Sequence, residues 1–356
     1  MEHLAQCRSS LFKVSTPFSA GIGFTIKGYN WIITSETLVR DNAYVVVESL
    51  SGERHQADII YVDPLLNVAF IDLPFDQAGE GLELSEQLQF EADMLVYAPC
   101  ISNHDYALKS GQLTEAVFPQ ENWDYMVHNI QIDVEHAGGP LVNQQGQLLA
   151  INNFGLSSDS NLFTALPVLG FIDALEKVKE SAPQQWVRCF NCRTFLSEKV
   201  ALESQSCTVC NEFVEFPKSI PLYEPVGVGR TIEALIEEAG FDPVLCRKGT
   251  HAWMIQVGSA TITLDYHEKS GMVNGEAVLC RLPEGKRFAI YEYLLKENQH
   301  LQHLSFSVHD AAVVLSLVIN DITLHADAGL EQLKELFHKA DYFDDYLIES
   351  FGATRY

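Results

Sequence analysis

The chain has 356 residues, 47% of them hydrophobic, which is enough for two or three domains with ordinary cores and excludes a disordered chain. Its formal net charge is −25 at pH 7, and a surface this acidic repels phosphates, so nucleic acid is not the favoured partner. The longest apolar run, at residues 311–319, is too short for a membrane helix, so we expect no membrane span. Residues 1–15 lack the apolar core of a secretory signal, and we therefore expect a soluble, cytoplasmic protein.

Residues 8–175 alternate between short apolar stretches and turn residues. The stretches have the length of strands, and their apolar residues stand either at every second position or in continuous runs. A helical spacing of apolar residues follows at 168–180. Many short strands with one terminal helix predict a pair of β-barrels. The expected strands are 20–26, 30–35, 43–50, 55–62, 93–99, 110–118, 125–133, 139–143, 148–154 and 161–167.

From Pro217 onwards the pattern changes to a mixture of helices and strands, which predicts a C-terminal α+β domain. Thr231 is expected to be the N-cap of the first helix, and Gly240 is expected to end it. Strands are expected between the first and second helices and again between the second and third. The expected helices are 231–240, 287–301 and 330–352.

Three motifs in the first 180 residues follow one another in the order of a protease signature. They are Gly21-Ile22-Gly23-Phe24, then Asp63-Pro64-Leu65-Leu66-Asn67, then Gly138-Gly139-Pro140-Leu141-Val142-Asn143. With these motifs, residues 8–180 resemble the HtrA-type branch of the trypsin-like serine proteases. The resemblance implies an all-β, trypsin-like double β-barrel over residues 1–180.

The resemblance also implies where a catalytic triad would lie: the histidine falls on Thr37, the aspartate on Asn67 and the serine on Ala137. Ala137 has no oxygen that could attack, Thr37 cannot act as a base near neutral pH, and Asn67 has no charge to stabilise an imidazolium. The oxyanion loop has Glu135 in place of a glycine, and a carboxylate there opposes a developing oxyanion. We therefore expect a pseudoprotease that has no catalytic residues and is not an enzyme.

The retained loop at 138–140 leaves three interpretations open. The barrel can need the glycines for a sharp turn, or the cleft can still hold an extended peptide by strand addition. In the third interpretation the chain is a protease with non-standard residues. His136 would then be a base or Thr37 a nucleophile, although the sequence offers no candidate base for Thr37.

Half of the eight cysteines form two Cys-x-x-Cys pairs: Cys189, Cys192, Cys207 and Cys210. Each pair can turn two thiolates toward one ion, and four thiolates complete a tetrahedron. The pairs are fourteen residues apart and resemble a zinc ribbon, so we expect one structural zinc ion per chain within residues 181–216. Redox pairs or an iron centre are the alternatives. Arg193 and Asn211 follow the pairs at a position where glycine is frequent, and Asn accepts a left-handed backbone more readily than Arg.

The C-terminal pattern resembles the YbjN-like domain and the related class I chaperones of type III secretion. The resemblance rests on the order of the elements and on the texture of residues 291–298 and 340–347, without a diagnostic motif. It implies that residues 217–356 bind an extended segment of a partner protein, and it allows a homodimer through this domain. Three aspartates of the last helix are expected to form a solvated face rather than a metal site: Asp341, Asp344 and Asp345.

These observations predict a multidomain, cytoplasmic, bacterial protein. Its domains are a trypsin-like pseudoprotease double barrel (1–180), a small zinc ribbon (181–216) and a YbjN-like or secretion-chaperone-like α+β domain (217–356). The predicted function is protein binding, as an adaptor or scaffold for a protein or an extended peptide segment. The alternatives are a protease with non-standard residues and a zinc-ribbon regulator that binds nucleic acid.

Overall fold

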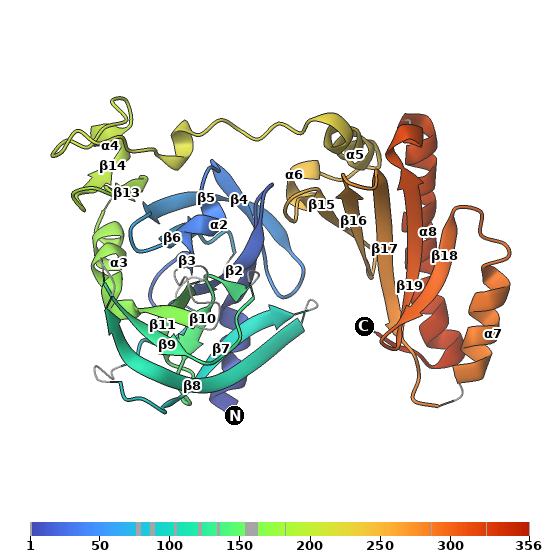
Figure 1. Ribbon diagram of the computed structural model, residues 1–356. Coiled ribbons are helices and arrows are strands. Elements are labelled where there is room, and N and C mark those ends of the chain that lie inside the picture. Colours follow the sequence, from blue (N-terminus) through green and yellow to red (C-terminus); the bar gives the residue numbers. More distant parts are fainter. Residues whose placement is uncertain are drawn as a thin grey trace. The chain divides into compact units, whose positions relative to one another are not determined.

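The computed structural model divides into two compact units, Met1–Tyr223 and Glu224–Tyr356 (Figure 1). Strands dominate the first unit, whereas the second unit combines one sheet with long helices (Figure 1). Among the described residues, no helix is both long and apolar enough to cross a membrane. The structure describes residues 2–75, 80–85, 90–102, 105–119, 123–133, 136–153, 163–181, 183–285, 287–324 and 326–355.

The first barrel consists of six strands that follow the short helix α1 (Glu2–Gln6). Neighbouring strands are antiparallel in the order β5-β4-β1-β2-β3-β6, and β5 also pairs with β6, which closes the barrel. The strands are β1 (Leu11–Ser15), β2 (Ala20–Thr25), β3 (Trp31–Thr34), β4 (Tyr44–Glu48), β5 (Arg54–Asp63) and β6 (Val68–Asp72).

Alternate side chains of these strands enter two different cores. Phe12 and Ile32 belong to a buried cluster inside the first barrel. Leu11 and Ile33 belong to a larger cluster that also contains residues of the second barrel. Both faces of these strands are therefore buried, which explains why their sequences are almost continuously apolar.

The second barrel is closed in the strand order β10-β11-β12-β9-β8-β7. The helix α3 (Ile172–Lys179) follows the last strand within the predicted range 168–180, and its Leu175 and Val178 are buried in the shared cluster. The predicted pair of β-barrels is confirmed. The strands are β7 (Leu95–Ser102), β8 (Asp105–Pro119), β9 (Asp124–His128), β10 (Pro140–Val142), β11 (Leu148–Asn153) and β12 (Phe163–Pro167).

Residues 186–216, here called the cysteine module, extend the sheet of the first barrel. The strand β13 (Trp186–Arg188) pairs in parallel with β5, with Trp186 opposite Tyr61 and Val187 opposite Val62. The strand β14 (Phe195–Ser197) pairs with β13 and is followed by the short helix α4 (Glu198–Ala201). The module is therefore attached to the barrel through backbone hydrogen bonds as well as side chains.

The second unit is an antiparallel sheet in the order β15-β16-β17-β19-β18, with the short β20 beside β17. The long helix α8 lies along this sheet (Figure 1). It approaches closely because Gly275 of β17 has no side chain: a Cβ there would come within 2.7 Å of Leu336. The strands are β15 (Ala252–Val257), β16 (Ala260–His267), β17 (Met272–Arg281), β18 (Leu304–His309), β19 (Ala312–Asn320) and β20 (Thr354–Arg355). The helices are α5 (Gly227–Glu238), α6 (Pro243–Cys246), α7 (Arg287–Glu297) and α8 (Ala326–Phe351).

The predicted start of the first helix in this unit was wrong. α5 begins at Gly227, so Thr231 lies inside the helix and is not its N-cap. Glycine has a low helix propensity, but a Cβ on Gly229 would lie 3.9 Å from the indole of Trp253, so packing against this ring supports the helix at its start. The predicted end is confirmed, because Gly240 has φ +96° and donates its amide to the carbonyl of Glu237.

The three aspartates near the end of α8 do not share one environment. Asp341 and Asp345 are exposed, as expected for a solvated face. Asp344 is buried, and burial raises the pKa of its carboxyl, so the expectation was wrong for this residue. Its side chain is hydrogen-bonded to Ser259 in the turn between β15 and β16, a contact that helical spacing alone cannot indicate.

Candidate functional site

Two of the three predicted triad positions are hydrogen-bonded to each other. Thr37 lies on the short helix α2 (Glu36–Val39), and Asn67 lies in the tight turn between β5 and β6 with φ +56°. The Oδ1 atom of Asn67 accepts the backbone N–H of Thr37 at 2.9 Å and its Oγ1 hydroxyl at 2.8 Å. The Nδ2 atom of Asn67 donates to Oδ1 of Asn153 at 3.4 Å, which links this turn to the second barrel.

The third position, Ala137, lies near Gly21 of β2, which is also close to Leu38 of α2. A Cβ atom on Gly21 would be 2.9 Å from a methyl of Leu38 and 3.4 Å from the carbonyl oxygen of Ala137. The first glycine of the Gly-x-Gly-Phe motif thus lets both α2 and the loop pack closely against β2. Thr37 is exposed, Ala137 is half-buried and Asn67 is buried, so the site is open to solvent at the threonine.

The loop before β10 has a conformation that only glycine fits well. Gly138 has φ +81°, and a Cβ there would come within 2.5 Å of the Thr34 hydroxyl oxygen and 2.7 Å of the Ser35 amide nitrogen. The amide of Gly138 donates to the carbonyl of Asn152, and the amide of Asn152 donates to the carbonyl of Gly139. The glycines therefore serve the fold directly, whatever chemistry the loop supports.

A buried histidine holds this loop through Asn152. The Nε2 atom of His128 lies 3.0 Å from Oδ1 of Asn152, and its Nδ1 accepts the amide of Ile130 at 3.3 Å. The Nδ2 atom of Asn152 donates to the carbonyls of Gly139 and Pro140, at 3.1 and 3.0 Å. Burial lowers the pKa of His128 to about 4, so the ring is neutral and can donate from Nε2. Sequence analysis did not single out Asn152. The feature that could have indicated it is the presence of a polar residue in the mostly apolar strand β11.

His136, the alternative base, faces an acidic neighbour in its own loop. Its Nδ1 atom lies 3.5 Å from Oδ2 of Asp133, and its amide donates to the carbonyl of Asp133. The side chain of His136 is mostly buried, with 11% of its surface exposed. Glu135, the residue expected to alter the oxyanion loop, lies outside the described residues.

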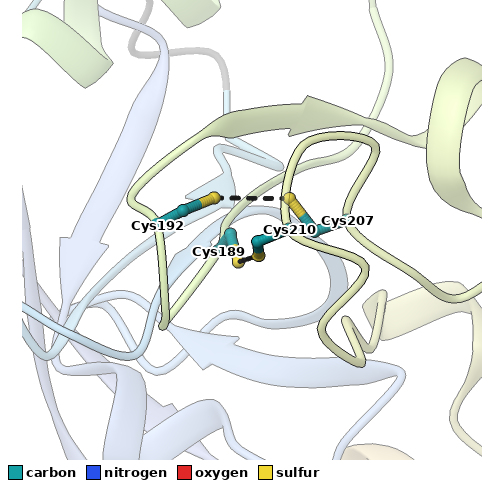
Figure 2. Close-up of side chains that lie close together, drawn as sticks. All are labelled: Cys189, Cys192, Cys207 and Cys210. Carbon is teal, nitrogen blue, oxygen red and sulfur yellow. Dashed lines mark hydrogen bonds between the residues drawn. The ribbon is translucent and has the colours of Figure 1, made fainter.

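The four paired cysteines of the cysteine module lie close together and point toward one another (Figure 2). Their sulfur atoms are all within 4.8 Å of one another, with Cys189–Cys210 at 3.6 Å and Cys192–Cys207 at 3.4 Å. Arg193 and Asn211, which follow the pairs, both have φ +62°. Their amides donate back to the carbonyls of Cys189 and Cys207, so both pairs form the same kind of turn.

These distances fit a metal ion bound by four thiolates. Four sulfurs at zinc–sulfur distances of about 2.3 Å in a tetrahedron are about 3.8 Å apart, close to the separations found here. The hydroxyl of Thr194 lies 3.1 Å from the sulfur of Cys192 and, as the largest contribution, lowers the pKa of that thiol to about 6. Among the described residues, this is the one group of three or more potential ligands close enough to hold a metal ion.

Comparison with known proteins identifies a peptidase fold in the first unit. Residues 21–151 match the family model of the trypsin-like peptidase domain. Similar proteins include the mitochondrial serine protease HTRA2 of Bos taurus, 28% identical over 153 residues, which are 40% of this chain and 33% of the relative. A probable periplasmic serine endoprotease, DegP-like, of Pseudomonas putida strain GB-1 is 23% identical over 172 residues, 46% of this chain and 35% of the relative. The chain spans about a third of the length of these relatives.

The comparisons contradict the prediction that the chain is not an enzyme. The relatives are named serine proteases, and the matching family model is a peptidase domain, so both findings point toward a protease. The prediction depended on the side chains of Thr37, Asn67 and Ala137, whereas the family match extends over residues 21–151. The first unit has a trypsin-like fold related to the HtrA proteases.

We expect the full chain to bind about one metal ion through the four cysteines. Cys192→Ser should lose the ion, because a serine hydroxyl does not replace a thiolate ligand and three thiolates leave the shell incomplete. Metal content of the purified protein, measured by mass spectrometry under reducing conditions, checks this. Cys100→Ala, which removes a buried thiol in β7, is the control and should keep the ion. Equal metal content in the two variants would contradict the assignment of the ligands.

We expect the first unit to lose stability as the pH falls from about 6.5 to about 4. His128 has its pKa lowered from 6.5 to about 4, so between these values the unfolded chain binds a proton that the folded chain does not. The loss should be at most on the order of 3 kcal/mol, and His128→Gln should remove it. Hydrogen exchange of β9 to β12 in rising urea, at several pH values, measures this.

The control for this experiment is His309→Gln, since His309 is an exposed histidine of the second unit. It should leave the pH dependence of the first unit unchanged. A wild-type protein whose first unit is equally stable at pH 7 and pH 4.5 would contradict a neutral, buried His128.

Proposed function

We propose that the first unit acts on proteins and binds an extended polypeptide segment beside Thr37, Asn67 and Ala137. The observation that carries this proposal is the fixed loop: Gly138 is held against β3, while Thr37 on the neighbouring helix remains exposed. The peptidase-domain match over 21–151 supports it, because proteases of this fold act on polypeptides. Extended segments bind such sites mainly through backbone hydrogen bonds.

Hydrolysis of the bound segment is the second candidate, and the names of the relatives favour it. We propose that Thr37, Asn67 and Ala137 occupy the positions of base, orienting carboxylate and nucleophile in trypsin-like proteases. Of these three side chains, Thr37 offers the exposed oxygen, and its hydroxyl proton is directed to Oδ1 of Asn67. Thr37→Val, which removes this oxygen and leaves a side chain of similar size, is therefore the substitution that separates binding from cleavage.

We propose that the cysteine module is a zinc ribbon with one structural Zn²⁺ ion. Four thiolates fill the four positions of the ion and leave none for a substrate. Thiols that bind zinc must stay reduced, which supports a reducing compartment such as the cytoplasm. The net charge of −25 disfavours nucleic acid as the partner of this module.

The proposed role for the second unit is that of a YbjN-like, chaperone-like domain that can pair with a second copy of itself. Its order is helix, three strands, helix, two strands and long helix, with the additional short α6 and β20. Phe288, Tyr291 and Leu295 are exposed and follow one another at helical spacing on one face of α7. A stripe of this kind on a helix that already buries another face is suited to packing against a partner.

We expect the full chain to associate reversibly through α7. Leu295→Asp should weaken association at least about tenfold, because it places a charge in the centre of an apolar contact. Analytical ultracentrifugation across a concentration series measures the dissociation constant. Gln299→Glu adds an equal charge just beyond α7 and should have little effect. A monomer at all concentrations, or equal effects of both substitutions, would exclude this surface.

We expect the full chain to bind unfolded casein. Fluorescence anisotropy of casein that carries a covalent fluorophore measures this binding. Thr37→Arg should weaken binding at least about tenfold, because the longer side chain covers the proposed site. Ser51→Arg makes the same change of charge at an exposed turn of the same barrel and is the matched control. Absence of binding, or equal loss in the two variants, would refute the location of the site.

The same samples report on cleavage when they are analysed by mass spectrometry. New casein fragments that are absent with Thr37→Val would support hydrolysis through the Thr37 hydroxyl. Fragments that persist in Thr37→Val would exclude this hydroxyl as the nucleophile. Binding without fragments would limit the function to recognition of the segment.

A further inference from the structure

A charged contact joins the cysteine module to the end of β5. Arg188 is the last residue of β13 and directly precedes Cys189, one of the four clustered cysteines. Its Nε atom lies 3.0 Å from Oδ2 of Asp63 and 3.1 Å from the hydroxyl of Tyr61. Its Nη2 atom donates to Asp173 of α3 at 2.8 Å. Asp63 and Tyr61 are fully buried, so this guanidinium lies against the interior of the first unit.

The same aspartate shapes the turn that leads to the candidate site. Oδ1 of Asp63 accepts the amides of Leu65 and Leu66, both at 3.1 Å, while Oδ2 accepts the hydroxyl of Tyr61 at 2.9 Å. Asn67 follows directly in the left-handed conformation. The position of the Asn67 side chain therefore depends on a turn that the Asp63 carboxylate organises.

The Asp63 carboxylate can accept the amides of Leu65 and Leu66 as a charged group only while a cation or hydrogen-bond donors compensate its buried charge. Burial raises the pKa of Asp63, and the charge of Arg188 opposes this rise. Removing the cation would leave a buried carboxylate without its compensating charge, which strongly destabilises the charged form. The turn at 64–66 would then lose the acceptor that now fixes two of its amides.

We propose that Arg188 is a positioning residue through which a metal-bound cysteine module holds Asn67 and Thr37 in place. The turn at Cys189 fixes the backbone directly after Arg188, and the four thiolates fix that turn when they hold a metal ion. Loss of the ion frees the end of β13, withdraws Arg188 from Asp63 and loosens the bonds between Thr37 and Asn67. This inference concerns the regulation of the polypeptide site and rests on the proposed function.

The test is hydrogen exchange of the full chain, with Zn²⁺ bound and after its removal by a chelator under reducing conditions. In the wild-type protein, removal should speed exchange of the amides of Thr37 and Leu66 at least about tenfold, while β11 stays unchanged. Faster exchange in the cysteine module without any change at Thr37 and Leu66 would overturn the proposal. The measurement uses no polypeptide, so its outcome is separate from the casein experiment.

Arg188→Met tests the route of the coupling. Exchange at Thr37 and Leu66 should already be fast with zinc bound, and chelation should add little, whereas Arg188→Lys should restore part of the response because it keeps the charge. A purely structural role for Arg188 would give additive effects of substitution and chelation. Arg54→Met is the matched control: Arg54 lies on β5, the strand of Asp63, and pairs with Glu48 of β4, so its replacement should leave the response to chelation intact.

A second substitution covers the case in which Arg188→Met fails to fold. Asp63→Asn keeps an oxygen that can accept the amides of Leu65 and Leu66 but removes the charge that attracts Arg188. It should retain zinc and respond to chelation at Thr37 several-fold less than the wild type. A full response in Asp63→Asn would overturn the proposal as well.

Discussion

The arrangement of the first unit depends on one buried carboxylate. Asp63 has no exposed surface, yet it meets a guanidinium, a phenol and two backbone amides within 3.1 Å. A buried charge is tolerated only with this degree of compensation, because desolvation of an unpaired carboxylate costs several kcal/mol. The negative charge of Asp63 at the end of β5 must therefore be compensated by groups of two other segments, the turn before Asn67 and the strand β13. None of these three segments can shift alone without leaving polar groups of the others unsatisfied.

The loop on the opposite side of the site is held by neutral groups. His128 and Asn152 form a chain of hydrogen bonds that ends on the carbonyls of Gly139 and Pro140, and the imidazole works in this chain because burial keeps it uncharged. A protonated ring would lose its acceptor for the amide of Ile130 and would carry a charge in an apolar barrel. Charged contacts thus fix the Thr37–Asn67 side of the site, whereas neutral contacts fix the Ala137 side.

The parts of the fold that were predictable follow from short-range patterns. The strands of the barrels were visible because both of their faces are buried, and the end of α5 was visible because Gly240 has a backbone that favours glycine. The start of α5 and the burial of Asp344 depend on packing partners distant in sequence, such as Trp253 and Ser259. The contact of Arg188 with Asp63 left no local signal for the same reason. The expectation that the chain is not an enzyme was wrong for another reason. It was based on the side chains at three positions, whereas the comparisons use the sequence of residues 21–151 as a whole.

The two barrels and the cysteine module have buried cores of very different size, and this difference indicates that the module depends more on the barrels than the barrels depend on the module. The barrels have extensive buried clusters of their own, whereas the cluster of the cysteine module consists of seven buried residues, two of which are Cys189 and Cys207. So small a core cannot stabilise a fold without a cross-link or a metal ion. If the four cysteines hold a metal ion, its loss should therefore unfold the module first and leave the barrels closed. A local change in the module then reaches the candidate site through the contact between Arg188 and Asp63. This contact joins the cysteine module, which is the less stable part, to a buried carboxylate of the barrel that is destabilised when it is left unpaired.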